Sequence, residues 1–370
     1  MTDEDQFREH VREALAEVVL PHADEWEAAG KIDSQGWRSL GDLGLLSLAH
    51  TGQEFMRSAV FLDELGRTGY AGIRAAIGVH AYMARSYLEL FGSTEQRARY
   101  LPGIRDGQRI AALAITEENA GSDLRDLATR AEARADGSYL VNGSKCYVTN
   151  GSSAGFFVAL VRSASASPRP VLSHASLLLI DADLPGVTRR EQPLLGWRSA
   201  DVCTIEFAEV LVPAGRLLGR PNQALTQLMR ALDFERLVAG LLAAGGVGHC
   251  LDLLRAFVRD HRIGGSPLSA KQAIRHQVAD LDCEYELVRH YAMHAARQQS
   301  LGLLDTRTAS VLKLKSTELA VTAAQRCLTC HGARGYQNDS AVSRLYRDAI
   351  AGTIAGGVSD LLRDLIYELG

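Results

Sequence analysis

The sequence Ile-Thr-Glu-Glu-Asn-Ala-Gly-Ser-Asp occupies residues 115–123, at the end of a short apolar run that predicts a β-strand. Gly121 and Ser122 predict a tight loop, whose backbone N–H groups and hydroxyl can bind a phosphate or the edge of a planar ligand. The same residues equally suit a surface turn with a helix N-cap at Ser122 or Asp123. Local chemistry leaves both interpretations open, and the segments on either side decide between them.

Working outward from this segment, the chain divides into three stretches of different periodicity. Apolar residues recur at helical spacing over residues 1–110 and again over residues 219–370. Between them, residues 111–218 show short apolar or alternating runs separated by turn residues, which is typical of an all-β domain. The order predicts an α+β protein with an N-terminal helical domain, a middle β domain and a C-terminal helical domain at these boundaries.

The composition indicates a folded, soluble protein, with 46% hydrophobic and 23% charged residues among 370. A formal net charge of -4 argues against nucleic-acid binding through a strong basic field. The longest apolar run, residues 237–248, is too short to span a bilayer, and the N-terminal residues lack the apolar region of a signal peptide. We therefore expect a cytoplasmic protein that binds neither nucleic acid nor a membrane.

A second motif, Asn-Gly-Ser-Lys-Cys-Tyr-Val-Thr-Asn-Gly, occupies residues 142–151. Its leading Asn-Gly pair predicts a hairpin turn, and the strand that follows ends at Thr149. A threonine at a strand end can present its hydroxyl to a planar ligand, although a plain hairpin explains the same residues.

A third motif, Leu-Asp-Phe-Glu-Arg-Leu-Val at residues 232–238, opens a strongly apolar helix. Burial would raise the pKa of Glu235, as a base that removes a proton from carbon requires. Alternatively, Asp233 and Glu235 complement the helix dipole in a first turn. A fourth motif, Cys-Leu-Thr-Cys-His at residues 327–331, matches a c-type haem attachment pattern. No axial methionine and no second ligand pair accompany it, so we expect two buried helical cysteines and no metal.

Taken in order, these segments resemble the acyl-CoA dehydrogenase family over nearly the whole chain. Residues 115–123 are similar to the family's T-E-x-x-A-G-S-D signature, and residues 141–151 to its N-G-x-K-x-x-I-T-N-G. The remaining matches are residues 92–107, 195–199, 207–213, 218–219, 272–274, 332–336 and 347–349.

The resemblance implies a middle β-barrel, a C-terminal four-helix bundle, and FAD bound between the β domain and the C-terminal helices. It implies α,β-dehydrogenation of an acyl thioester, with an electron acceptor that the sequence does not identify. Because family FAD sites are completed by a second subunit, a homodimer or homotetramer is expected. The residues that the resemblance places at the cofactor are Thr116, Gly121, Ser122, Tyr147, Thr149, Arg262, Gln272, Gly332 and Asp360.

The resemblance also places the catalytic base. Most family members carry it late in the chain, at a position occupied here by Gly356, which cannot act. A minority carry it as the glutamate of an E-R-L pattern, which Glu235-Arg236-Leu237 matches. Glu235 is therefore the expected base, and Arg236 is expected to bind substrate. With Gly356 at this position, the chain also resembles family members that act on acyl or peptidyl carrier proteins in polyketide and nonribosomal peptide pathways. Coenzyme A and a carrier protein are therefore both candidates for the group that carries the thioester.

Four departures weaken the expected FAD contacts. His261, Gly264, Thr329 and Val358 replace an arginine, phenylalanine, glutamine and threonine of the family, and lost cationic and hydroxyl partners weaken the binding of a diphosphate. Two alternative functions on the same fold follow. One is a redox-neutral thioester enzyme, such as a cyclase, isomerase or dehydratase, and the other is a flavin-dependent monooxygenase. The short loop at residues 46–52 is expected to open the substrate entrance.

Overall fold

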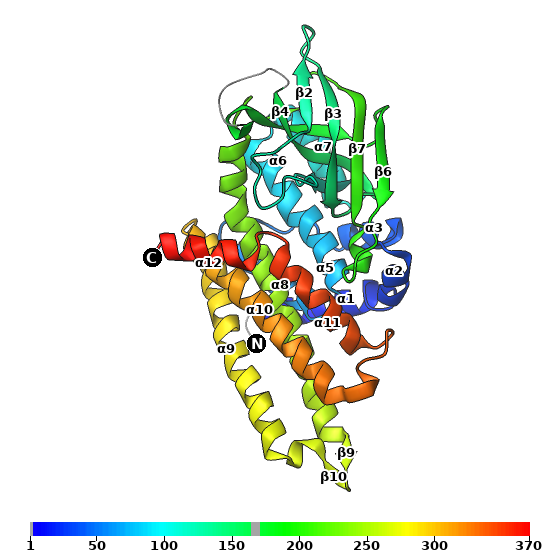
Figure 1. Ribbon diagram of the computed structural model, residues 1–370, viewed down its shortest axis with the longest axis vertical. Coiled ribbons are helices and arrows are strands. Elements are labelled where there is room, and N and C mark those ends of the chain that lie inside the picture. The colour runs from blue at the N-terminus through cyan, green and yellow to red at the C-terminus, as the bar shows by residue number, and fades with distance from the viewer. Residues whose placement is uncertain (1–2, 164–170) are drawn as a thin grey trace.

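A computed structural model describes residues 3–163 and 171–370, and it is elongated, with the β domain at one end (Figure 1). A π-helical segment, Val79–Ala84, joins α5 to α6, so the chain from residue 71 to residue 91 is continuously helical. Ser93 begins α7 with a capping box, in which its hydroxyl accepts from the Gln96 N–H and the Gln96 side chain accepts from the Ser93 N–H. The N-terminal helices are α1 Asp3–Val18, α2 Ala23–Ala29, α3 Ser34–Asp42, α4 Phe55–Gly66, α5 Ala71–Gly78, α6 Arg85–Phe91 and α7 Thr94–Arg105.

The middle domain is built on a sheet of eight strands, in the order β6-β7-β3-β2-β4-β5-β8, with β1 paired in parallel to β4. Strand β4 is buried on both faces. Its Phe157 packs within the β domain, whereas Phe156 packs with Tyr100 of α7 and, in the same cluster, Ala231 of helix α8 (Ala224–Asp260). The strands are β1 Ile110–Ala114, β2 Arg130–Ala133, β3 Tyr139–Val148, β4 Ala154–Ser163, β5 Ala175–Asp181, β6 Val187–Glu191, β7 Cys203–Val212 and β8 Leu217–Leu218.

The predicted hairpin at Asn142-Gly143 is wrong. Both residues lie inside the continuous strand β3, where the pairing with β7 shifts register between Val141 and Gly143. A Cβ at Gly143 would lie 2.5 Å from the Thr129 Cα, and its φ of 150° is one that other residues rarely adopt. An Asn-Gly pair thus marks a β-bulge here, since a bulge needs the same backbone freedom as a turn.

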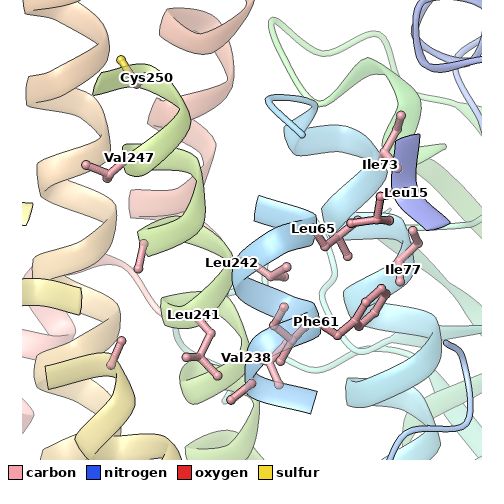
Figure 2. Packing of buried hydrophobic residues seen from close by; sticks show 14 of the residues in the cluster. Leu15, Phe61, Leu65, Ile73, Ile77, Val238, Leu241, Leu242, Val247 and Cys250 are labelled. Carbon is pink, nitrogen blue, oxygen red and sulfur yellow. The ribbon is translucent and has the colours of Figure 1, made fainter. Parts of the chain in front are cut away.

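The C-terminal domain is helical, and its longest helix, α8, extends from the β domain to the opposite end of the molecule (Figure 1). Figure 2 shows how Val238, Leu241 and Leu242 of α8 meet apolar side chains of the N-terminal helices, among them Phe61 and Ile77. The remaining elements are α9 Gln272–Ser300, α10 Thr306–His331, α11 Ala341–Ile354 and α12 Ser359–Glu368, with α8 spanning Ala224–Asp260 and a short hairpin of β9 Arg262–Ile263 and β10 Ser266–Pro267. The α+β architecture with helical, β and helical parts is confirmed.

Helix α8 is long and apolar enough, by length and composition alone, to cross a membrane. However, 78% of its most apolar window is buried inside the protein. That burial is what the central helix of a folded domain requires, because its apolar surface is covered by neighbouring helices.

Candidate functional site

Glu235 lies where α8 of the C-terminal domain meets α6 of the N-terminal domain. The Tyr87 hydroxyl donates a hydrogen bond of 2.8 Å to Glu235 Oε1. Burial raises the pKa of the Glu235 carboxyl group, and the Tyr87 hydrogen bond and the charge of Arg236 oppose that rise. Part of the Glu235 surface stays accessible. An accessible carboxylate with a raised pKa is suited to accept a proton from a weak acid.

The helix-dipole interpretation of Asp233 and Glu235 is wrong. Helix α8 begins at Ala224, not near residue 232, so both carboxylates lie beyond its first turn. The dipole acts mainly within that turn. Asp233 instead accepts hydrogen bonds from Thr306 Oγ1 (2.7 Å) and Arg236 Nη1 (3.3 Å).

Two cations lie close to each other between α8 and α10. Arg236 Nη1 contacts Ser310 Oγ at 3.4 Å, and its Nε has no hydrogen-bond partner among the described residues. Lys313 is fully buried, and its Nζ donates to the carbonyl oxygen of Gly357. Burial, followed by the charge of Arg236, lowers the pKa of Lys313 to about 8. The predicted substrate residue Arg236 therefore has a buried Nε without a partner among the described residues, and it lies near the lysine that binds the Gly357 carbonyl oxygen.

The first motif folds against strand β3. The Cys146 N–H donates to the carbonyl oxygen of Thr116 at 2.9 Å, and a Cβ at Gly121 would lie 3.7 Å from Thr116 Cγ2. Thr116 and Gly121 are therefore neighbours beside β3, and Ser122 next to them is exposed. Neither Ser122 nor Asp123 begins a helix, so the predicted N-cap is wrong. The exposed loop leaves its hydroxyl and N–H groups available to a ligand.

A buried ion pair holds that loop to β3. Glu117 and Lys145 are 6% and 0% exposed, and Lys145 Nζ lies 2.8 Å from Glu117 Oε1. Lys145 also donates to the carbonyl oxygen of Ile115 at 3.1 Å. Glu117 in turn accepts from the backbone N–H groups of Ala128 (2.6 Å) and Thr129 (2.9 Å). The glutamate and lysine of the two motifs are thus structural partners that fix the loop between them.

Tyr147 and Thr149 stand at the end of β3. Tyr147 is 61% exposed with a φ of 55°, and its N–H donates to Gln192 Oε1 at 2.7 Å. Thr149 is partly buried. The next residue, Asn150, is buried and donates through its side-chain amide to the carbonyl oxygen of Ala76 at 2.9 Å. This contact attaches the end of the strand to α5, so the position of Thr149 depends on packing between domains.

The other predicted cofactor residues lie elsewhere. Arg262 in β9 and Gln272 at the start of α9 lie at the end of the molecule opposite β2 and β3 (Figure 1). Gly332 ends α10 nearby, since Arg334 Nη1 lies 3.5 Å from His261 Nδ1. The structure therefore does not bring these residues together with Thr116 or Tyr147 in one chain. Asp360, near the start of α12, is exposed.

The Cys-Leu-Thr-Cys-His motif ends helix α10. Cys327 is buried as predicted, but Cys330 is only partly buried, which corrects the expectation of two buried cysteines. His331 Nδ1 contacts the carbonyl oxygen of Cys327 at 2.8 Å, and its ring stacks on Phe257. Within residues 3–163 and 171–370, no group of three or more His, Cys, Asp or Glu side chains is arranged to hold a metal ion.

Sequence reasoning missed Tyr87 and Lys313. Tyr87 and Glu235 are 148 positions apart in the chain, so no spacing relates them. Lys313 lies within residues 219–370, where the sequence predicts helices, but nothing local distinguishes a buried lysine from one on the solvent face of a helix.

Profiles of three domains match the chain in order. They are "Acyl-CoA dehydrogenase, N-terminal domain" over residues 1–108, "Acyl-CoA dehydrogenase, middle domain" over residues 112–210 and "Acyl-CoA dehydrogenase, C-terminal domain" over residues 222–369. Among curated proteins, mitochondrial isovaleryl-CoA dehydrogenase from Oryza sativa is 31% identical, over 98% of this chain and 90% of its own. Mitochondrial long-chain specific acyl-CoA dehydrogenase from Sus scrofa is 30% identical, over 99% of this chain and 86% of its own.

Solved structures agree with these matches. An acyl-CoA dehydrogenase from Geobacillus kaustophilus superposes with a TM-score of 0.94 at 28% identity, covering 100% of this chain and 98% of its own. The prolyl acyl carrier protein oxidase AnaB superposes with a TM-score of 0.91 at 25% identity, covering 100% of this chain and 99% of its own.

Proposed function

Because the chain belongs to the acyl-CoA dehydrogenase family, whose members are FAD-dependent oxidoreductases acting on CH–CH groups of acyl thioesters, we propose that Glu235 is the base of this reaction here. The observation that carries the proposal is the Glu235 carboxylate itself. It lies at an interface of two domains, has a pKa raised by burial, and accepts a hydrogen bond from Tyr87. Gly356 leaves no second carboxylate at the alternative position.

Glu235 would remove the proton from the carbon next to the thioester carbonyl. The C–H bond to that carbon breaks, the proton moves to the carboxylate, and the electron pair becomes part of a new carbon–carbon double bond. FAD, when bound, supplies the acceptor for the hydride that leaves the neighbouring carbon. The charge of Arg236, the next residue along α8, favours negative charge developing beside the base.

The residues that are expected to bind FAD fit the cofactor, but within one chain they form two separate groups, each of which is half of a binding site. One half is the exposed loop and strand end with Thr116, Gly121, Ser122 and Tyr147, and Thr149 beside them. The other half carries Arg262, Gln272 and Gly332 at the far end of the molecule (Figure 1). We propose that a second copy of this chain joins the two halves, which requires at least a homodimer. Arg334, 3.5 Å from His261, offers a cation near the position where the family has arginine.

The thioester carrier is the finer part of the proposal. Among its structural neighbours is a prolyl acyl carrier protein oxidase. In addition, Gly356 occupies the position where most family members have the base, and this difference resembles family members that act on carrier proteins. We propose an acyl or peptidyl carrier protein as the physiological carrier, in secondary metabolism. Comparing acyl-CoA with the same acyl group on a carrier protein tests this, and a higher kcat/KM for the coenzyme A substrate overturns it.

The proposed reaction is tested by the visible spectrum of the purified protein with added FAD, followed by thioester substrates. Bleaching of a bound flavin by an acyl thioester is expected in the wild type. Glu235→Gln should lower the bleaching rate by about 10²- to 10⁴-fold, the usual size of a general base contribution. Asp252→Asn, which changes an exposed carboxylate on the same helix, is the matched control and should bleach at the wild-type rate.

A second candidate rests on the His261 substitution. The His261 ring stacks on the Phe257 ring with a centroid distance of 4.8 Å, and it does not supply the arginine side chain that the family has at this position. A protein that cannot be loaded with FAD, yet exchanges the α-proton of a thioester in a manner that needs Glu235, would be a redox-neutral enzyme. Flavin reactivity with oxygen that is unaffected by Glu235→Gln would indicate a monooxygenase.

A further inference from the structure

Tyr87 is a buried side chain that none of the sequence motifs includes. It is 1% exposed, its ring packs near Phe91 at a centroid distance of 6.1 Å, and its hydroxyl donates to Glu235 Oε1 at 2.8 Å. The bond joins two helices from different domains. A buried hydroxyl bonded to a carboxylate controls where that carboxylate points and how readily it binds a proton.

The hydrogen bond distinguishes the two oxygens of Glu235. Oε1 accepts the Tyr87 hydroxyl, so Oε2 is the oxygen left to accept a proton from a substrate. Burial and the neighbouring carboxylate raise the pKa of Tyr87 well above 10, so its hydroxyl stays protonated and keeps donating. Tyr87 therefore cannot take the substrate proton onward as a phenolate, and its effect on Glu235 is through orientation and charge.

Arg236 is the charged group that acts on Glu235, and the charged groups of α10 and α6 have other partners. On α8 itself Arg236 lowers the pKa of Glu235, and on α10 Lys313 repels Arg236 electrostatically. On α6 the charged neighbours of Tyr87 are engaged elsewhere, because Glu89 Oε2 lies 2.8 Å from His50 Nδ1. The direct hydrogen bond to the carboxylate therefore comes from a neutral donor, Tyr87.

Helix α6 is held firmly enough to fix that donor. Arg85, two residues before Tyr87, donates to the carbonyl oxygens of Leu46 and Leu48. Gln299 of α9 donates to the carbonyl oxygen of His50 at 2.8 Å, so the short loop at residues 46–52 is tied to both α6 and α9. A donor on a helix with such anchors keeps its position without cost at the moment of reaction.

We propose that Tyr87 is a positioning residue, which holds Glu235 through Oε1 so that Oε2 faces the substrate. The inference rests on the proposed function, in which Glu235 is the base. It adds a residue that determines the pH range of the reaction.

The test compares Tyr87→Phe with the wild type by two measurements. The first is the pH dependence of kcat/KM, whose acid limb should move to higher pH by about one to two pH units, since the lost hydrogen bond favoured the charged carboxylate. The second is an infrared titration of the carboxyl band of Glu235 in the purified protein, assigned by its absence in Glu235→Gln. This band should titrate at a correspondingly higher pH in Tyr87→Phe.

Tyr100→Phe is the matched control. Its hydroxyl donates to Asp181 Oδ1 at 2.7 Å, so the control also removes one buried tyrosine–carboxylate hydrogen bond, away from Glu235. It should leave both the acid limb and the Glu235 band at their wild-type positions. Equal movement of the acid limb in both variants, or an unmoved Glu235 band in Tyr87→Phe, overturns the inference.

The two measurements separate this inference from the proposed function. If no thioester is dehydrogenated, the proposed function fails, while the infrared titration still reports whether Tyr87 lowers the pKa of Glu235. If dehydrogenation occurs and Glu235→Gln retains full activity, Glu235 is not the base, and the positioning role of Tyr87 falls with it.

Discussion

The buried pair of Lys145 and Glu117 gives the sharpest prediction about stability. Lys145→Met removes two hydrogen bonds, to Glu117 Oε1 and to the carbonyl oxygen of Ile115, and leaves Glu117 buried with only two backbone N–H donors. Removing one partner of a buried ion pair costs about 3 to 5 kcal/mol, because the remaining charge is unpaired. Glu117→Gln should also destabilise, since Lys145 then keeps a charge that is 0% exposed.

The double variant Lys145→Met/Glu117→Gln should lose less stability than the sum of the single variants, because neither charge is left unpaired. Urea unfolding followed by far-ultraviolet circular dichroism measures all three. The exposed pair of Arg125 and Asp123, in the same loop, provides the control, and Arg125→Met should unfold at the wild-type urea concentration. A change of less than about 0.5 kcal/mol for Lys145→Met, or strict additivity in the double variant, refutes the reasoning.

Two further predictions concern the packing between domains. A Cβ at Gly245 of α8 would overlap the carbonyl oxygen of Asp63 in α4, so Gly245→Ala should destabilise by about 3 kcal/mol in urea unfolding, whereas Gly352→Ala meets only a Thr317 side chain at 3.3 Å and should be nearly neutral. Burial raises the pKa of Asp348 to about 6, above its ordinary 3.8, so the folded protein holds a proton that the unfolded chain loses as the pH rises through this range. Asp348→Asn keeps an acceptor for the Trp197 N–H. Its free energy of unfolding should therefore rise relative to that of the wild type as the pH increases from 4 to 6, by up to about 3 kcal/mol. A difference in unfolding free energy between the two proteins that stays constant with pH contradicts this assignment.

The sequence was informative where a pattern is local. Helical spacing over residues 219–370 predicted the part of the chain that contains α8 to α12, and short alternating runs over residues 111–218 predicted the part that contains most of the strands, because side-chain periodicity is set by the backbone geometry of each element. The start of α8 was placed at 232 instead of Ala224, and that error produced the incorrect helix-dipole interpretation of Glu235.

The candidate site shows the same division. Sequence patterns identified Glu235, Arg236, Thr116 and Thr149, since each belongs to a short segment whose residue types and order resemble those of a family. Patterns also placed Arg262 among the cofactor residues, but they could not show that it lies at the opposite end of the chain's own fold (Figure 1). Whether two segments share a site depends on distance in space, which a list of motifs does not contain.

The sequence by itself determined the order of helical, β and helical parts, the family, and the identity of the candidate base. Only the tertiary structure decided that Tyr87 meets Glu235, that Lys145 neutralises Glu117, and that Lys313 is buried beside Arg236. The physical reason is that a pKa and a hydrogen bond depend on burial and on partners. Those partners come from different elements, which the packing of α6, α8 and α10 and the folding of the 115–123 loop against β3 bring together.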